Sequence, residues 1–460
     1  MPFNREKANK FSHERIINNQ VIKEKIDQYR IICDIDKDNN VRKEVQFRFQ
    51  QNEMGNVRKV DFIFTIDSSF TELPLNDDIP SAKMGIVNFS SNIINLNKKS
   101  DIYDKSGFIN PQKYNEIYNS NILTFVCPTF NLVPKEDDSL SVVDSIRKEI
   151  YDFYYNNSPF NSVKLIESLF NVIREANTSL KLKCRNQKCK SNDKTLNRKD
   201  TGILVDLDKV HIEPFKCEHC GNIMYLTDYL RLHEAIDEEF GHSTVLTRFA
   251  QVTEHLISIN LIDTLIKHKS WNLLTNTAFI IDGPLAIYGE PAKIHRSLLR
   301  YLHYISEKLE NPIIYFGIIK SGRLKDHFTL LEKKIELEQN SFMLVDDSYR
   351  FKYIQKAPEN NQYFGQEVSF GQDFLFYSKG KKRFVVSMLY PMRNKDINFK
   401  ENAFDYRNYN NLSTVLNLIN EISIDLYEDA ILPLALAHKY AAISLNPGTN
   451  ILEKFIKSNL

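Results

Sequence analysis

The 460-residue sequence lacks an excess of charge of either sign. Its 60 Lys and Arg residues are matched by 59 Asp and Glu residues, for a formal net charge of +1. No global basic field therefore predicts a nucleic-acid partner, and any such surface has to be a local patch. The chain also lacks a run near the roughly 18 apolar residues of a membrane span, and its first residues contain no apolar core of the signal-peptide type. We therefore expect a cytoplasmic protein without a membrane partner.

Cysteine is scarce, but four of the six cysteines stand in two close pairs. In a cytosolic protein such pairs predict zinc ligands instead of disulfides. Four thiolates fill the tetrahedral coordination of Zn²⁺, so this zinc is expected to be structural. The four ligands are Cys184, Cys189, Cys217 and Cys220. The basic residues around them leave three roles open for this segment: contact with phosphates, contact with a protein, or solubility.

Two short apolar runs end in an aspartate. The stretch Thr277–Gly289 reads TAFIIDGPLAIYG, in which four apolar residues precede Asp282 and a Gly-Pro turn. The stretch Asp61–Phe70 has the same pattern and leads to Asp67. A short apolar run bounded by turn residues predicts a buried strand. Each aspartate alone is consistent with an ordinary turn residue, but two such strand ends form a candidate pair of ligands for Mg²⁺ or Mn²⁺.

Three further residues are candidates for chemistry. Glu254 lies on an apolar row of an amphipathic helix, and it is either an inward metal ligand or a flanking glutamate that reaches water or Arg248. Lys320 ends an apolar strand, and it is either a solvated turn cation or a clamp on a phosphate. His438 follows Pro433 in a helix with apolar neighbours. It is either a core histidine or a group that positions water or binds metal.

The rest of the pattern alternates between helix and strand. Residues Glu14–Tyr29 predict an amphipathic helix with its isoleucines facing inward, and residues 45–50 (VQFRFQ) predict a strand. A helical pattern resumes after the second cysteine pair, and a last one runs from Leu412 to Ser444. Because the cysteine pairs interrupt a helical region, we expect them to form an inserted module.

The motifs follow one another in a recognisable order. They are DSS at 67–69, Arg-x5-Glu from 248 to 254, IDGPL at 281–285, IIKS at 318–321 and LPLALAH at 432–438. In order and spacing, from about residue 60 to 445, this series resembles the NurA nuclease family. The first motif has Ser68 where the family usually has glycine, and the second has Pro284 where serine is common.

The resemblance implies an α/β fold with an RNase H-like mixed-sheet nuclease core, flanking helices and an inserted zinc ribbon. The nuclease domain would comprise residues 1–180 and 226–460, with the ribbon at 181–225. Asp67 and Asp282 would be metal ligands on two strands, and Glu254 the helical carboxylate. His438 would be the histidine of the last helix and a further ligand, and Lys320 the basic residue after the third strand. Glu149 or Glu167 could instead take the role of Glu254.

The sequence thus predicts a DNA nuclease that uses Mn²⁺ or Mg²⁺, with a structural Zn²⁺. The family implies a homodimer that works with a HerA-type hexameric ATPase, in DNA end resection or in defence against foreign DNA. Two alternatives stay open: a non-catalytic module that docks an ATPase onto DNA, and an RNase H-like enzyme that acts on RNA or a hybrid.

Overall fold

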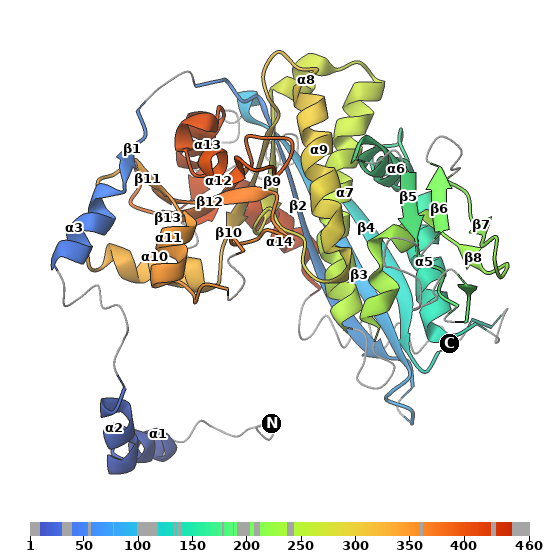
Figure 1. Cartoon of the computed structure of the whole chain (residues 1–460), viewed down its shortest axis with the longest axis horizontal. Helices are drawn as coiled ribbons and strands as arrows, with labels where there is room; N and C mark the ends of the chain where they lie inside the picture. The colour runs from blue at the N-terminus through green and yellow to red at the C-terminus, as the bar shows by residue number, and fades with distance from the viewer. Residues whose placement is uncertain are drawn as a thin grey trace.

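The structure is a computed structural model, shown in Figure 1. It describes residues 10–29, 39–53, 57–76, 78–98, 118–132, 134–135, 140–176, 179–186, 188–190, 203–206, 212–236, 243–358, 362–424 and 429–443. Among these residues, no helix combines the length and the hydropathy that crossing a bilayer requires.

Nine described strands form one mixed sheet in the order β1-β11-β12-β13-β10-β9-β2-β3-β4. Their bounds are β1 (Gln50–Gln51), β2 (Phe62–Pro74), β3 (Lys83–Asn95), β4 (Tyr118–Phe130), β9 (Thr277–Asp282), β10 (Ile314–Ile319), β11 (Ser341–Leu344), β12 (Gly371–Tyr377) and β13 (Arg383–Leu389). Strands β2, β3 and β4 form an antiparallel meander, and β9 and β10 continue the sheet parallel to β2. Three antiparallel strands followed by two strands parallel to the first is the RNase H-like arrangement, so the predicted fold class is confirmed.

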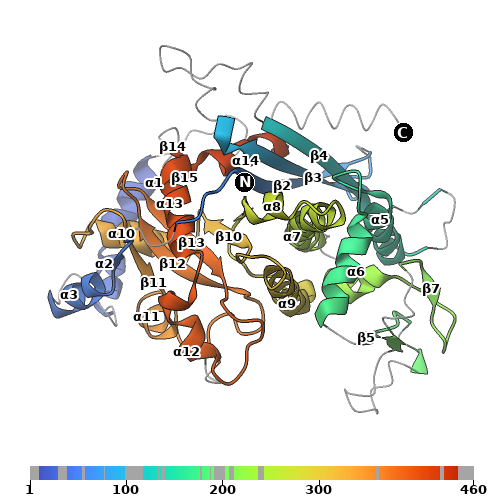
Figure 2. The ribbon, with the colours of Figure 1, turned by 90° about the horizontal axis from the view of Figure 1, so that it is seen from above.

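Helices cover both faces of this sheet, and Figure 2 shows α7 and α9 on the opposite side of β2 and β3 from α14. One face packs against α5 (Val142–Asn156), α6 (Leu165–Ala176), α7 (Ser243–Lys267) and α9 (Ile294–Ser306), with α10 (Arg323–Glu332) and α11 (Asp347–Tyr353) farther along it. The other face packs against α13 (Leu412–Ile422) and α14 (Leu432–Ala441). The sheet is therefore the middle layer of three.

Side chains alternate along β2, and this alternation determines which residues point to each face of the sheet. Phe64 and Ile66 join the core beneath α7, whereas Ile63 joins the core beneath α13 and α14. Because successive side chains of a strand point to opposite faces, Asp67 belongs to the α14 face and Ser68 to the α7 face. Asp67 is 7% exposed and lies in the middle of β2, because β2 stays paired with β3 as far as Pro74. The prediction that the first strand ends at Asp67 was therefore wrong, whereas β9 does end at Asp282.

The smaller elements lie mainly in connections and near the chain ends. They are α1 (Lys10–Ile17), α2 (Gln20–Asp27), α3 (Asn39–Phe47), α8 (Trp271–Thr275), α12 (Phe399–Ala403), the 3₁₀ helices η3 (Leu226–Leu230), η4 (Leu232–Ala235), η5 (Glu290–Lys293) and η6 (Tyr406–Asn408), and the short strands β5 (Ser179–Leu182), β6 (Ile203–Asp206), β7 (Phe215–Lys216), β8 (Ile223–Met224), β14 (Ser423–Ile424) and β15 (Ala430–Ile431).

Three further predictions about local structure were wrong. The isoleucines of Glu14–Tyr29 do not face a core, since Ile16, Ile17 and Ile26 are all more than half exposed. The first half of the 45–50 stretch is the end of helix α3, in which Val45 is buried against the core that contains α10 and α11, and within the stretch only Gln50 lies in a strand. The last helical region is interrupted by β14 and β15, which pair with each other.

Candidate functional site

Asp67 and Asp282 lie on neighbouring parallel strands. In the β2–β9 register Ile66 pairs with Ile281, and these two residues directly precede the two aspartates. Register partners on parallel strands point to the same face, and both aspartates belong to the α13 and α14 side. The predicted convergence of residues 215 positions apart in the sequence is therefore present.

A glycine pair shapes the turn after Asp282. Gly283 has φ +117°, a conformation that L side chains rarely adopt, and its N–H donates to Ile318 O at 2.9 Å. A Cβ on Gly317 of the neighbouring β10 would lie 2.1 Å from Gly283 O. Both glycines are thus required for the chain to turn away at this point and leave the Asp282 carboxylate at the end of its strand.

Glu254 approaches from α7, on the other side of the sheet. The Ser68 hydroxyl donates a short hydrogen bond to its Oε1. Burial raises the pKa of Glu254 well above its usual value, the charges of Asp67 and Asp282 raise it further, and the Ser68 hydrogen bond opposes the shift. The three carboxylates, which we call the carboxylate cluster, are therefore close enough to repel one another.

His438 is tied to Asp67. Its Nδ1 lies 2.8 Å from Asp67 Oδ2, and because an ionised carboxylate can only accept, Nδ1 is the donor. This contact fixes the ring and leaves Nε2 free of that bond, on a side chain that is 68% exposed. The alternative of a core histidine is thereby excluded, since the ring stands at the surface beside the cluster.

Lys320 is paired with Asp282. Its Nζ donates to Asp282 Oδ2 at 2.6 Å, and the lysine side chain is 37% exposed. Burial raises the pKa of Asp282, the Lys320 ammonium lowers it, and the charge of Asp67 raises it again; the net direction is upward. The ammonium thus offsets only part of the cost of a negative charge at this position.

The donor set of the cluster suits a divalent cation. Carboxylate oxygens with a nearby imidazole are ligands that Mn²⁺ accepts, and Mg²⁺ prefers oxygen. Among the described residues, though, the cysteines alone bring three or more ligand atoms of His, Cys, Asp or Glu within 4.8 Å of one another. The carboxylates instead contact Lys320, His438 and Ser68, so a cation would compete with Lys320 for Asp282.

Residues considered as alternatives for the helical carboxylate lie elsewhere. Glu167 accepts a hydrogen bond from the Lys164 N–H at the start of α6, where it caps the helix. Glu149 lies on α5, where Lys148 and Asp152 are the charges that affect its pKa. Arg248 lies 3.7 Å from Glu290, and Glu254 is instead bonded to Ser68.

Two serines were missed as members of the site. Ser68 binds Glu254, and the Ser69 hydroxyl donates to Ala441 O at the end of α14 while it accepts from the Ile443 N–H at 3.1 Å. These contacts join the DSS motif to a helix on each face of the sheet. The motif itself contained a signal, because serine hydroxyls next to a strand aspartate can hydrogen-bond to groups on either face of the sheet.

The four predicted zinc ligands are brought together. Cys184 Sγ and Cys220 Sγ are 3.5 Å apart, and Cys189 Sγ and Cys217 Sγ are 3.7 Å apart. Thiolates at about 2.3 Å from a tetrahedral Zn²⁺ lie about 3.8 Å from one another, so the observed spacing fits this ion. All four sulfur atoms lie within 4.8 Å of one another.

Backbone hydrogen bonds form the turn that carries the second cysteine pair. Strands β7 and β8 pair at Phe215–Met224, and the Cys217 N–H donates to Asn222 O at 2.8 Å. Gly221 has φ +75° and donates to Cys217 O at 2.8 Å, which closes the turn around Cys220. The local sequence thus places both thiols on one side of a hairpin.

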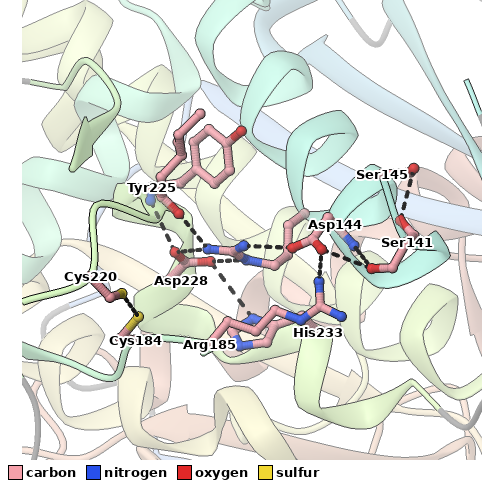
Figure 3. A network of polar contacts seen from close by, with 11 residues as sticks. Ser141, Asp144, Ser145, Cys184, Arg185, Cys220, Tyr225, Asp228 and His233 are labelled. Atoms are coloured by element: carbon pink, nitrogen blue, oxygen red, sulfur yellow. Dashed lines mark hydrogen bonds and ion pairs between the residues drawn. The ribbon is translucent and has the colours of Figure 1, made fainter. Parts of the chain in front are cut away.

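A polar network fixes the cysteine module to α5 (Figure 3). Arg147 of α5 binds both carboxylate oxygens of Asp228, at 2.9 and 2.7 Å, and donates to Ile223 O in β8. Asp144 accepts from Arg147 and forms an ion pair with Arg185, which follows the ligand Cys184. Both Arg147 and Asp228 are buried, so the network is a structural link instead of a surface contact.

No protein-family model and no curated protein matches the chain. Among solved structures, the chain is similar to the NurA nuclease from Sulfolobus solfataricus, with 11% identity and a TM-score of 0.36, over 99% of this chain and 98% of that one. It is also similar to a structure of NurA with manganese, with 12% identity and a TM-score of 0.24, over 97% and 98% of the two chains. Both are structures of the family that the motifs resemble, but likeness at these values establishes no activity.

Proposed function

We propose that the chain is a nuclease that depends on a divalent metal and hydrolyses phosphodiester bonds of DNA at the carboxylate cluster. The observation that supports this proposal is the convergence of Asp67, Glu254 and Asp282 beside His438 and Lys320. Burial and the charge of Asp67 raise the pKa of both Glu254 and Asp282, so these carboxylates gain from a shared cation that neutralises charge which the protein itself only partly compensates.

Each residue has a role that follows from its contacts. Asp67, Glu254 and Asp282 would hold Mn²⁺ or Mg²⁺, and His438 would either join them as a ligand or position water. When bound, such an ion activates water near neutral pH and stabilises charge on the phosphate. Asp67 orients the His438 ring, whose Nε2 can accept a proton from the attacking water. Once displaced from Asp282, Lys320 can contact a phosphate oxygen and neutralise it.

Substitution of a strand aspartate tests the site. Asp282→Asn and Asp67→Asn should each abolish cleavage of labelled linear DNA in Mn²⁺, because an amide cannot supply the lost charge. EDTA should abolish cleavage by the wild type. Asp152→Asn, an exposed aspartate of α5 paired with Lys148, is the matched control and should cleave normally.

Melting curves show whether these substitutions act on chemistry or on folding. The Asp282→Asn variant should melt close to the wild type, because loss of the charge also removes an unfavourable burial. Cleavage retained by both variants would refute the site. Loss of cleavage with a large fall in melting temperature would instead assign the aspartates a structural role.

The nature of the substrate and partner is part of the proposal. We expect DNA as substrate, a homodimer, and a HerA-type ATPase that supplies DNA ends for resection or defence. Parallel assays on DNA, RNA and hybrid separate the proposal from an RNase H-like enzyme that acts on RNA. A chain that binds DNA and the ATPase but cleaves nothing in Mn²⁺ would be a docking module.

We further propose that the cysteine module holds one structural Zn²⁺. The sulfur spacing supports it, and four thiolates leave no open position for chemistry. Purified protein should contain one zinc per chain by elemental analysis, and the Cys217→Ser variant should contain much less. Strong chelation should lower the melting temperature of the wild type, because zinc bound only by the folded state stabilises that state. Full occupancy in the variant would contradict the proposed ligand set.

A further inference from the structure

A second candidate binding site lies in a cavity of about 200 Å³ apart from the carboxylate cluster. It lies between α9 and the 363–366 and 393–395 segments, and none of the five residues of the candidate active site lines it. Its lining includes four cationic side chains: Arg296, Arg300, Arg393 and Lys395. In a chain with a formal net charge of +1, such a concentration of positive charge is a local feature.

Two of the four cations have carboxylate partners. Arg296 Nη2 lies 2.8 Å from Glu367 Oε2, in a pair that is more than half exposed. Arg393 contacts Glu175 and lies 3.6 Å from Glu307. Because the Arg296–Glu367 pair is exposed, it contributes little energy, and Arg296 can rearrange toward a ligand at small cost.

The other two cations have no carboxylate within 4.0 Å among the residues that the structure describes. Arg300 donates from Nε to Asn394 Oδ1 at 2.7 Å and from Nη1 to Ala176 O at 2.5 Å. Lys395 Nζ donates to Gln366 O at 2.8 Å and to a neighbouring carbonyl at 3.3 Å. These neutral acceptors orient both groups but supply no counter-charge.

Burial, and not the neighbouring rings, makes the charge of Lys395 costly. Its ammonium lies 5.6 to 5.9 Å from the ring centroids of Tyr363, Tyr390 and Phe399, in cation–π contacts that attract the charge but supply no negative partner. Burial lowers the pKa of Lys395 to about 7, and the positive charge of Arg296 adds to this effect. An anion in the cavity would offset both contributions.

We propose that this cavity binds a phosphate group in monoester form, either as free phosphate or at the end of a nucleotide. Guanidinium groups match phosphate oxygens through paired hydrogen bonds, and an ammonium adds a point charge. Pockets for whole organic ligands usually measure about 300–1,000 Å³, so a cavity of about 200 Å³ suits a phosphate better than a complete nucleotide. The sugar and base would then remain outside.

Calorimetric titration of the full chain without added divalent metal tests this proposal. Inorganic phosphate and thymidine 5′-monophosphate are the probes, and thymidine is the neutral control. Both phosphates should bind and thymidine should not. Tighter binding of the nucleotide identifies a nucleotide end as the source, and equal or weaker binding identifies free phosphate. If neither inorganic phosphate nor the nucleotide binds at millimolar concentration, the proposal is overturned.

Matched variants locate the binding. Arg300→Ala and Lys395→Met should each weaken phosphate binding by about tenfold or more, since each removes a charge-assisted contact. Lys352→Met removes an exposed lysine of α11 outside the cavity and should leave binding unchanged. Melting curves check each variant, and Lys395→Met still tests the site if Arg300→Ala fails to fold. Equal binding by the wild type and a folded Lys395→Met variant would place the phosphate elsewhere.

Discussion

Asp263 of α7 is a single residue whose ionisation is linked to folding. The Tyr301 hydroxyl donates to its Oδ1, and the Asn171 amide donates to its Oδ2 at 3.3 Å. Burial raises the pKa of Asp263 to about 6, although these hydrogen bonds oppose the shift. The group thus keeps its proton in the folded state at pH values where the unfolded chain has lost it.

The pH dependence of stability follows from this shift. A carboxyl with a raised pKa stabilises the folded state at pH below about 4, and that contribution is lost as pH rises through about 6. The Asp263→Asn variant cannot lose this contribution, because an amide does not titrate in this range. The free energy of unfolding of the variant, relative to wild type, should rise by up to about 3 kcal/mol between about pH 4 and pH 7.

Urea denaturation at several pH values measures this difference. A constant offset between the two proteins is expected from the changed hydrogen bonds, so the slope with pH is the informative quantity. The exposed Asp152→Asn variant should show no such slope relative to wild type. If the difference in free energy of unfolding between Asp263→Asn and the wild type does not change with pH, the carboxyl titrates in the folded protein as it does in the unfolded chain.

At the scale of elements, α5 connects the cysteine module to the sheet. Arg147 reaches from α5 to Asp228 of η3 and to the β8 carbonyl, while the neighbouring Asp144 reaches Arg185 beside Cys184. A hairpin of two-residue strands has little core of its own. Its position therefore depends on zinc and on this network.

Removal of one partner from the buried pair should be costly. Arg147→Met leaves Asp228 buried without its bidentate partner and should destabilise the protein by about 3–5 kcal/mol. The double variant Arg147→Met/Asp228→Leu should recover much of that loss, because no charge then remains unpaired. Thermal or urea unfolding of the four proteins in this cycle measures the coupling. Additive losses would indicate that the two side chains do not interact.

At the scale of the whole molecule, the last described helix closes over the first strands of the sheet. Pro433 O accepts a hydrogen bond from Thr65 of β2, and Asn88 of β3 donates to Ala441 O at 3.2 Å. Leu434 and Ala437 are fully buried in this contact. The same packing brings His438 to Asp67, so one long-range contact serves both the core and the site.

Truncation at residue 431 tests this arrangement. The shortened chain should lose cleavage and melt at a clearly lower temperature, because loss of one buried leucine side chain alone typically costs about 2–5 kcal/mol. His438→Ala in the full chain should reduce cleavage but keep the melting temperature, since the ring is largely exposed. If the truncated chain melts like the full one, α14 does not pack on the sheet.

The sequence by itself determined the two buried strands that carry the aspartates and the cysteine ligands, but it placed the end of the first strand too early. The apolar runs before Asp67 and Asp282 predict buried strands because a short, fully apolar segment bounded by turn residues is typical of a strand inside a sheet. The paired cysteines predict a metal site because two thiols this close in the sequence can bind the same ion. The periodicity of apolar residues was a less reliable guide at 45–50 and at Glu14–Tyr29, because the burial of these residues depends on which other elements pack against them. The boundaries of the nuclease domain and the ribbon stay a prediction.

Only the tertiary structure decided which carboxylate joins the two aspartates. Glu149 and Glu167 lie on amphipathic helices, whereas Glu254 lies on α7, which is buried around most of its circumference and is not the amphipathic helix that the sequence predicted. The distinction comes from the packing of α7 across β2, which places Glu254 against Ser68. The phosphate cavity likewise combines residues from α9 and two later segments. Such sites depend on contacts between distant parts of the chain, and local periodicity contains no information about those contacts.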